Sequence, residues 1–481
     1  MPTIKCALLL EAADRPVAPS RQIETENERV SAVSPIAAAD AEPLFVLPAL
    51  VNAHDHGRPV RTNSFDGGGG RPLESWLHYQ ALIPPVDPYL AAVLALSRSA
   101  LGGVGAVMMH LTRPQGLTDL STEAAAIARA GRDVGVRVGF AVSMRDNNPL
   151  VYGPSEPILA ALPAAARAEI EKLLRKPLPP KDFVALVDDV AAAAAGPMFD
   201  VQFGPNGVQW CTDALLGAIA DASRRTGRRI HMHLLETRYQ RAWADATHPS
   251  GVVKHLDELG LLSPRLTLAH CVWARPQELE LLAERGVTIA VNTSSNLHLR
   301  SGIAPLAAMV AAGCRVAFGI DGSALDDDDD ALRELRLGHL LHVGNGFQVA
   351  VSRESLLHAA FANGRRAVTN SDRGGAILPG EPADLLLLDW AAIDEDRLRE
   401  SSDPLRLVLS RATARHIRQL IVAGRTIVKD GAVLGVDVAT ARAEVLGRMR
   451  HAMAKKAAIV EVLLLLESAV AKYFEPSPGC F

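Results

Sequence analysis

Short and almost continuous apolar runs recur along the first two thirds of the chain, and longer amphipathic segments separate them. Eight such runs lie between positions 44 and 321: LFVLPALV, GVGAVMMH, VRVGFAVSM, FDVQFGP, RIHMHLL, LTLAHCV, VTIAVNT and RVAFGID. Runs that stay apolar at successive positions are typical of parallel strands buried on both faces. The segments between them, such as DALLGAIADASRRTG, have the pattern of crossover helices. We therefore predict an α/β fold, a (β/α)8 barrel of the TIM type, with its site at the carboxyl ends of the strands.

The two ends of the chain have a different pattern from this central part. After about Gly374 the segments GAILPGEPADLLLLD and IRQLIVAGRTIVKDGAV predict short strands joined by glycine-containing turns. We expect a small composite β-sandwich domain that is formed by residues 1–47 and 374–439. The barrel is expected over residues 48–373, and a helical tail over residues 440–481. Two long connections, after the first and third runs, are expected to shape a pocket at the barrel mouth.

An apolar stripe marks the predicted helical tail. Its members recur at spacings of three and four: Ile459, Val462, Leu463, Leu466, Val470 and Tyr473. Such a stripe has to be covered, either by the chain's own barrel or by a second subunit, and both alternatives stay open. The second alternative predicts a homodimer or a higher homo-oligomer.

Polar residues of one chemical kind end several of the apolar runs. His54 and His56 follow the first run, His233 lies in the fifth, His270 ends the sixth and Asp321 ends the eighth. The carboxyl ends of barrel strands meet at one mouth, and residues two apart in an extended strand point to the same side. Three imidazoles and a carboxylate suit Zn²⁺ or a similar divalent ion.

A base beside such a centre would make it catalytic. Glu236 comes three residues after His233, where a carboxylate could meet both water and substrate, and His270 could polarise the water or an oxyanion. Asp321 could also accept a proton. Each residue alone has a simpler explanation, as a core histidine, a helix-start carboxylate or a turn, but four strands ending in ligand-type residues argue against coincidence. His231 is interpreted as a packing residue, and His110 as either core or pocket.

Composition excludes several classes of function. The 481 residues carry 50 basic and 54 acidic side chains, a net charge of −4, and no basic cluster, which argues against nucleic-acid binding. No run of about 18 uncharged apolar residues occurs, so no membrane span is expected. The five cysteines are scattered without CxxC spacing, and the N-terminus has no signal-like segment. We expect a cytoplasmic protein.

Six motifs together resemble the amidohydrolase superfamily, in its cytosine-deaminase-like branch with the triazine hydrolases. They are PALVNAHDH, HMHLLET, LAHCVW, NTSSNLHLRSGIAP, GIDGS and LPGEPADLLLLD. The resemblance implies a barrel with a composite β domain and one catalytic metal. By match it implies that the ligands are His54, His56, His233 and Asp321, that Glu236 is the proton shuttle, and that His270 orients or activates the water. No lysine ends the fourth run, which agrees with one metal rather than two.

The pocket wall departs from the family pattern. Where many relatives have His-Ala-Pro-Tyr after the fourth strand, this chain has GPNGVQWCTD. Residues that follow barrel strands are the candidate substrate contacts: Trp210, Gln209, Arg145 and Asn147. Trp210 could stack on a flat ring, or it could be plain core packing.

These features predict a metal-dependent hydrolase that cleaves a carbon–nitrogen bond of a small molecule. The leading hypothesis is an aminohydrolase that releases ammonia or an amine from a nitrogen heterocycle, with zinc as the metal and Fe²⁺ or Mn²⁺ as alternatives. Hydrolysis of an amide, carbamate, urea or ring-halide bond is the second hypothesis, since the same centre could serve it. A barrel that binds metal without turnover is disfavoured, because a mere metal holder needs no base such as Glu236.

Overall fold

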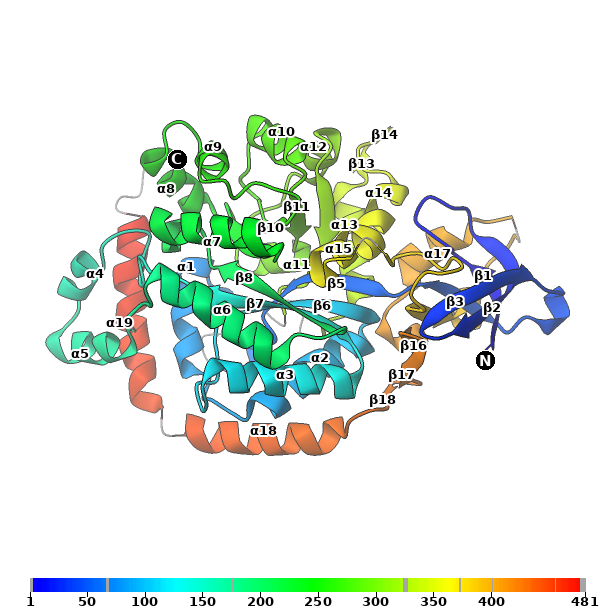
Figure 1. Cartoon of the computed structure of the whole chain (residues 1–481), viewed down its shortest axis with the longest axis horizontal. Coiled ribbons are helices and arrows are strands. Elements are labelled where there is room, and N and C mark those ends of the chain that lie inside the picture. The colour runs from blue at the N-terminus through cyan, green and yellow to red at the C-terminus, as the bar shows by residue number, and fades with distance from the viewer. Residues whose placement is uncertain are drawn as a thin grey trace.

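An eight-stranded parallel barrel forms the centre of the molecule (Figure 1). The computed structural model describes residues 3–65, 69–174, 176–322, 328–371, 373–399, 401–454 and 456–475. The barrel strands are β5 (Leu50–Asp55), β6 (Val104–Leu111), β7 (Arg137–Met144), β8 (Phe199–Pro205), β9 (Ile230–Leu234), β10 (Leu266–His270), β11 (Thr288–Val291) and β12 (Arg315–Phe318). They neighbour one another in chain order, and the Asp321 N–H donates to the His54 carbonyl at 2.8 Å, which joins the last strand to the first. The predicted barrel is confirmed.

Helices surround the barrel strands because each presents an apolar face to the sheet. The longer ones are α2 (Pro88–Leu101), α3 (Leu120–Val134), α6 (Pro180–Ala194), α7 (Asp213–Thr226), α8 (Arg238–Thr247), α10 (Pro276–Glu284) and α13 (Ala331–His342). In α7 the Thr212 hydroxyl caps the N-terminus by accepting the Leu215 N–H, and Gly227 ends the helix at a φ of 74°. Its apolar residues Leu215, Leu216 and Ile219 are buried. Local sequence thus determines where this helix starts, ends and packs.

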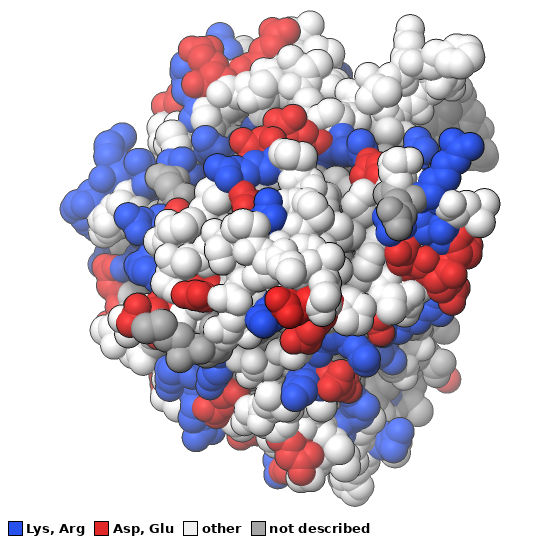
Figure 2. All heavy atoms as spheres, turned by 90° about the vertical axis from the view of Figure 1, so that its right-hand side faces the viewer, with Lys and Arg blue, Asp and Glu red and all other residues white. Residues whose placement is uncertain are grey.

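A second sheet lies beside the barrel (Figure 1). Its order is β18-β17-β16-β15-β4-β1-β2-β3, so four strands from the C-terminal part of the chain form one half of the sheet and four from the N-terminal part form the other. The bounds are β1 (Thr3–Leu9), β2 (Ala18–Glu26), β3 (Arg29–Pro35), β4 (Leu44–Pro48), β15 (Leu385–Asp389), β16 (Ile417–Val422), β17 (Arg425–Lys429) and β18 (Ala432–Val433). Basic and acidic side chains are interspersed on the face that the molecule presents here (Figure 2), in agreement with the balanced charge.

The first apolar run is divided between the two sheets. The apolar pattern predicts one barrel strand over LFVLPALV, and this prediction is wrong in detail. Residues 44–48 form β4, which pairs with β15 in the small sheet, and β5 begins at Leu50 and pairs with β6 in the barrel. Proline lacks the N–H that a continuous central strand needs, so Pro48 suits the junction.

The helical tail packs on the chain's own barrel domain. It comprises α18 (Val438–Met453) and α19 (Ala457–Phe474), and α19 lies beside α4 (Glu156–Ala160) and α5 (Ala164–Leu173) (Figure 1). Leu463, Leu466 and Val470 are buried in one cluster with residues of the two long connections, including Tyr79 and Ile158. Packing on the same chain, one of the two alternatives, is therefore observed for Leu463, Leu466 and Val470, whereas Tyr473 of the same stripe is exposed.

Two expectations from composition concern the helices and the thiols. Within the described parts of the chain, no helix has both the length and the apolar character needed to cross a membrane. The thiols of Cys6, Cys211, Cys271 and Cys314 are free and buried, and Cys480 lies outside the described residues.

Candidate active site

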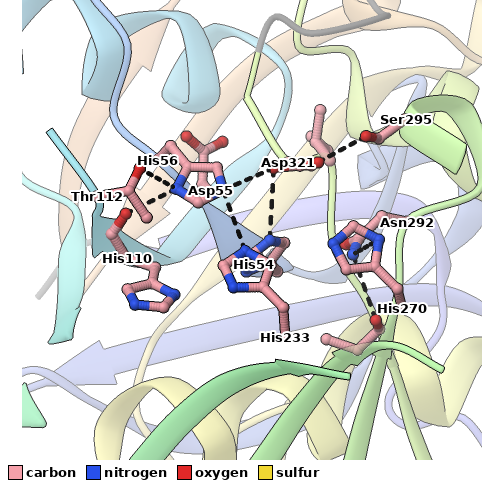
Figure 3. A network of polar contacts seen from close by, with 12 residues as sticks. His54, Asp55, His56, His110, Thr112, His233, His270, Asn292, Ser295 and Asp321 are labelled. Carbon is pink, nitrogen blue, oxygen red and sulfur yellow. Dashed lines mark hydrogen bonds and ion pairs between the residues drawn. The ribbon is translucent and has the colours of Figure 1, made fainter. Parts of the chain in front are cut away.

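Five of the polar residues that end the predicted strands meet at the barrel mouth (Figure 3). His54 and Asp321 are 3.4 Å apart between Nε2 and Oδ1, and His56 Nε2 lies 3.0 Å from the same oxygen. His233 Nε2 is 3.4 Å from His56 Nε2. Ligand atoms of His54, His233 and His270 also lie within 4.8 Å of one another. Side chains from β5, β9, β10 and the end of β12 therefore converge on one point.

The donor set fits a divalent cation. His54 Nε2, His270 Nε2 and Asp321 Oδ1 are buried and have no hydrogen-bond partner among the described residues. Unpaired polar atoms are costly in a buried environment. Imidazole nitrogens and a carboxylate oxygen at one point are the ligand types that zinc takes in proteins, so a bound ion would satisfy them.

Hydrogen bonds behind the rings fix which nitrogen faces the centre. His56 Nδ1 lies 2.8 Å from the His110 carbonyl, and His233 Nδ1 lies 2.6 Å from the Asn206 carbonyl. A carbonyl only accepts, so Nδ1 carries the proton in both rings and the Nε2 lone pair points into the site. The Ser295 hydroxyl donates to Asp321 Oδ2 at 2.6 Å, which leaves Oδ1 facing the histidines.

Burial sets the charge of these groups. It lowers the pKa of His54 to about 3 and that of His233 well below its ordinary value, so both rings are neutral at pH 7. Burial opposes ionisation of Asp321, but the contacts with His54 and His56 outweigh it and hold the pKa of that carboxyl well below its usual range. Neutral imidazoles and an ionised carboxylate are the protonation states that bind metal.

Glu236 follows β9 directly and faces His270. Its Oε2 is 3.6 Å from His270 Nε2, and the Ser301 hydroxyl donates to its Oε1 at 3.5 Å. Burial, followed by the charges of Asp321 and Glu74, raises the pKa of Glu236 well above its ordinary value. A carboxyl with a raised pKa can hold and release a proton near neutral pH.

His270 is positioned by its backbone and by a side-chain amide. Its Nδ1 lies 2.8 Å from Asn296 Oδ1, an acceptor, and 3.3 Å from Asn292 Nδ2, a donor. The shorter contact favours the proton on Nδ1, with the Nε2 lone pair facing the site. Its φ of 75° and the φ of 64° at Asp321 place both residues in the left-handed region. Such strained backbone is concentrated at functional sites.

His231 and His110 have contacts that the sequence did not predict. His231 Nε2 is 2.8 Å from His54 Nδ1, so the residue interpreted as packing lies directly behind a candidate ligand. His110 donates from Nε2 to the Gly204 carbonyl at 3.0 Å, and its own carbonyl accepts from His56. The HMH pattern was the available signal for His231, because residues 231 and 233 share one side of the strand.

A cavity between the connections that follow β5, β7 and β8 contains two of the four predicted substrate contacts. Arg145 and Trp210 line it, together with Glu74, His78, Tyr152 and Phe474. Gln209 is buried and Asn147 is exposed, and neither lines this cavity. Their main chains hold the wall together, since the Gln209 carbonyl accepts from Asn148 and the Asn147 N–H donates to the Trp210 carbonyl. The role of each as a substrate contact stays a prediction.

Comparison with known proteins identifies the family. The model of the Amidohydrolase family matches residues 45–427. The chain belongs to the amidohydrolase family. Similar curated proteins include a 5'-deoxyadenosine deaminase of Methanopyrus kandleri, 29% identical over 82% of this chain and 83% of the relative. A 5-methylthioadenosine/S-adenosylhomocysteine deaminase of Nitratidesulfovibrio vulgaris is 30% identical over 82% of this chain and 81% of the relative.

Solved structures share the fold of this amidohydrolase. An adenosine deaminase from Xanthomonas campestris with bound zinc superposes with a TM-score of 0.74 at 22% identity, over 93% of this chain and 98% of that one. The atrazine chlorohydrolase of Arthrobacter aurescens complexed with zinc gives 0.76 at 21% identity, over 94% and 100%. Family and fold confirm the predicted resemblance, the barrel and the class of enzyme, a hydrolase acting on carbon–nitrogen bonds.

Proposed function

We propose that this amidohydrolase is a zinc-dependent aminohydrolase that replaces an exocyclic amino group of a nitrogen heterocycle with oxygen and releases ammonia or an amine. The observation that carries this proposal is the placement of Glu236 and His270 beside the convergence of His54, His56, His233 and Asp321. The two curated relatives described above are deaminases of adenine nucleosides, which supports the substrate class.

The proposed metal ligands are the three histidines and Asp321. A zinc ion held there supplies Lewis acidity, which activates a water and stabilises negative charge that develops on oxygen. The zinc in the related structures supports this choice of metal. His231, Asn206 and Ser295 are proposed as the groups that orient the ligands from behind.

Glu236 is the proposed proton carrier. Its carboxylate takes a proton as water adds to the ring carbon, and its carboxylic acid returns that proton to the departing nitrogen when the carbon–nitrogen bond breaks. The raised pKa matches this double role. The His270 Nε2 lone pair can accept a hydrogen bond from the attacking water, and Asn296 keeps that nitrogen unprotonated.

Ammonia release from aminated heterocycles tests the proposal. Purified enzyme is supplied with adenosine, 5'-deoxyadenosine, 5-methylthioadenosine and an amino-substituted triazine, and ammonia is measured with a coupled assay. We expect release from at least one of them. A chlorinated triazine and a carbamate are tested in parallel. Chloride or amine release from these without any ammonia from the aminated compounds would replace this proposal by the second hypothesis.

Assembly and location are further parts of this proposal. A homodimer or a higher homo-oligomer, a small-molecule substrate without nucleic acid, and a cytoplasmic location stay predictions. Leu464 and Leu465 of α19 are half-exposed, which leaves an apolar strip on the tail for a second subunit.

A further inference from the structure

Glu74 is a buried carboxylate that the proposed chemistry does not use. It lies on α1 (Leu73–Tyr79), in the long connection after β5, and its exposed fraction is 5%. It lines the cavity that also contains Arg145 and Trp210. Carboxylates are seldom this buried unless a cation or hydrogen-bond donors contact them. The contacts of Glu74 therefore show which of its oxygens is still available to a ligand.

The two oxygens of Glu74 have different surroundings. The Tyr152 hydroxyl donates to Oε1 at 2.6 Å, and the Thr237 hydroxyl donates to the same oxygen. Oε2 is equally buried but has no hydrogen-bond partner among the described residues. The structure thus holds one carboxylate oxygen in place from behind and leaves the other as an unpaired acceptor.

Glu74 lies close enough to Glu236 for its charge to act on that carboxyl, and the cavity that Glu74 lines has aromatic walls. Thr237 is the residue after Glu236, so the group that holds Glu74 is adjacent in sequence to the proposed proton carrier. The Tyr152 ring lies 5.8 Å from the Trp210 ring and 5.0 Å from the Phe474 ring of α19. Burial raises the pKa of Glu74 above its ordinary value, and the hydrogen bonds from Thr237 and Tyr152 oppose that rise. Burial and the charge of Arg145 lower the pKa of His78 to about 4, so this second lining residue is neutral at pH 7.

We propose that Glu74 Oε2 accepts a hydrogen bond from a hydroxyl or ammonium group on the arm that the heterocyclic substrate carries beyond its reacting ring. This inference rests on the proposed function, and it adds that the arm of the substrate must carry a hydrogen-bond donor. The aromatic walls contact the carbon skeleton of the arm, and the single unpaired acceptor selects an arm with a donor. An arm without a donor leaves Oε2 buried and unpaired, which costs affinity.

Paired ligands that differ only in the arm test this inference by binding. In the Glu236→Gln background, affinities for adenosine, 9-(2-aminoethyl)adenine and 9-methyladenine are measured by calorimetry, because the three share a ring and differ in hydroxyl, ammonium or no donor. Glu74→Gln is then added. The side-chain carbonyl of the glutamine can still accept hydrogen bonds from Tyr152 and Thr237. Its NH₂ group, a donor, then occupies the position of Glu74 Oε2. We expect adenosine or the aminoethyl compound to lose about 10- to 100-fold in affinity, as for a hydrogen bond to a charged group, and 9-methyladenine to change little.

The matched control is Glu123→Gln, which alters another buried glutamate, on α3, whose carboxylate accepts from the Gln115 and Gly116 amides. It should leave all three affinities unchanged.

Equal weakening of all three ligands by Glu74→Gln, no weakening, or no binding of any ligand overturns the inference. Donor-dependent binding by a protein that releases no ammonia would instead refute the deaminase proposal and keep the role of Glu74. Ammonia release by the enzyme, together with unchanged affinities in Glu74→Gln, would keep the deaminase proposal and refute the role of Glu74.

Discussion

Burial has two opposite effects on the ionisable side chains at the barrel mouth. It keeps the rings of His54 and His233 neutral, so that their lone pairs are available to a cation. It also raises the pKa of Glu236, so that this carboxyl binds a proton more strongly than an exposed glutamate does. The same physical cause thus suits His54 and His233 to the proposed role of metal ligands and Glu236 to the proposed role of proton carrier.

Metal content is the first prediction at this scale. We expect the purified enzyme to hold about one zinc ion per chain, and Asp321→Asn to lower that content because the amide cannot carry the negative charge. Elemental analysis measures both, and Glu236→Gln, which alters a carboxyl outside the proposed ligand set, is the matched control. Chelation should abolish activity, and added zinc should restore it. Full activity in protein shown to be metal-free would contradict the assignment.

The second prediction concerns proton transfer. Glu236→Gln preserves the shape of the side chain but cannot carry a proton, so kcat should fall by at least about 10²-fold, since general acid–base catalysis contributes roughly 10²–10⁴. The fold and the metal content should be retained. Steady-state kinetics on the substrate identified by ammonia release measures the effect, with Glu123→Gln as the control. Near-normal turnover of Glu236→Gln would exclude this role.

At the scale of elements, α19 supplies both packing and pocket wall. Its Glu467 accepts hydrogen bonds from Arg71, Ser75 and Tyr79 in the connection after β5. Its Phe474 lies against Tyr152 and lines the cavity. A segment that follows both sheets in sequence is therefore part of the wall around the proposed substrate arm.

Two leucines of α19 give a matched pair of substitutions. Leu466 is 1% exposed and Leu464 is 50% exposed. Leu466→Ala should lower the free energy of unfolding by about 2–5 kcal/mol, whereas Leu464→Ala should change it by no more than about 0.5 kcal/mol. Urea unfolding compares the two variants, and light scattering gives their subunit number. A large loss for Leu464→Ala together with dissociation would show that a second subunit covers the exposed side of the helix.

At the scale of the whole molecule, a buried ion cluster ties the small sheet to the barrel. Asp384, just before β15, accepts from Arg137 at the start of β7 at 3.1 Å and from Arg365 after the barrel. It also accepts the Ala423 N–H at 2.7 Å. Burial opposes ionisation of Asp384, but Arg365 and Arg137 prevail and hold its pKa below the ordinary 3.8.

Neutralising this carboxylate should uncouple the two sheets. Asp384→Asn leaves two arginines without a counter-charge in a buried site, so we expect a loss of about 3–5 kcal/mol in the free energy of unfolding. Because the folded pKa is lowered, the ionic contribution is present above about pH 4 and is lost as the pH falls through the folded pKa. Wild type and variant should thus converge in acid, as measured by urea unfolding between pH 3 and pH 7. Equal stability at pH 7 would contradict this coupling.

The sequence by itself determined the features that depend on neighbours along the chain. Continuous apolar runs predicted the barrel strands, and strand periodicity put His54 and His56 on one side. Because barrel strands expose their carboxyl ends together, the positions of His233, His270 and Asp321 at the ends of such runs assign them to the same mouth. The resemblance of the motifs led from there to the family.

Only the tertiary structure decided which residues meet across large separations. The pairing of His54 with His231 spans 177 positions, and Tyr152 and Thr237 approach Glu74 from other connections. Only the tertiary structure also shows that the first apolar run is divided between two sheets. A continuous apolar pattern does not indicate which sheet contains the neighbouring strand. A hydrogen bond needs its two atoms within about 3 Å in space, and periodicity constrains only the direction in which each side chain leaves its own element.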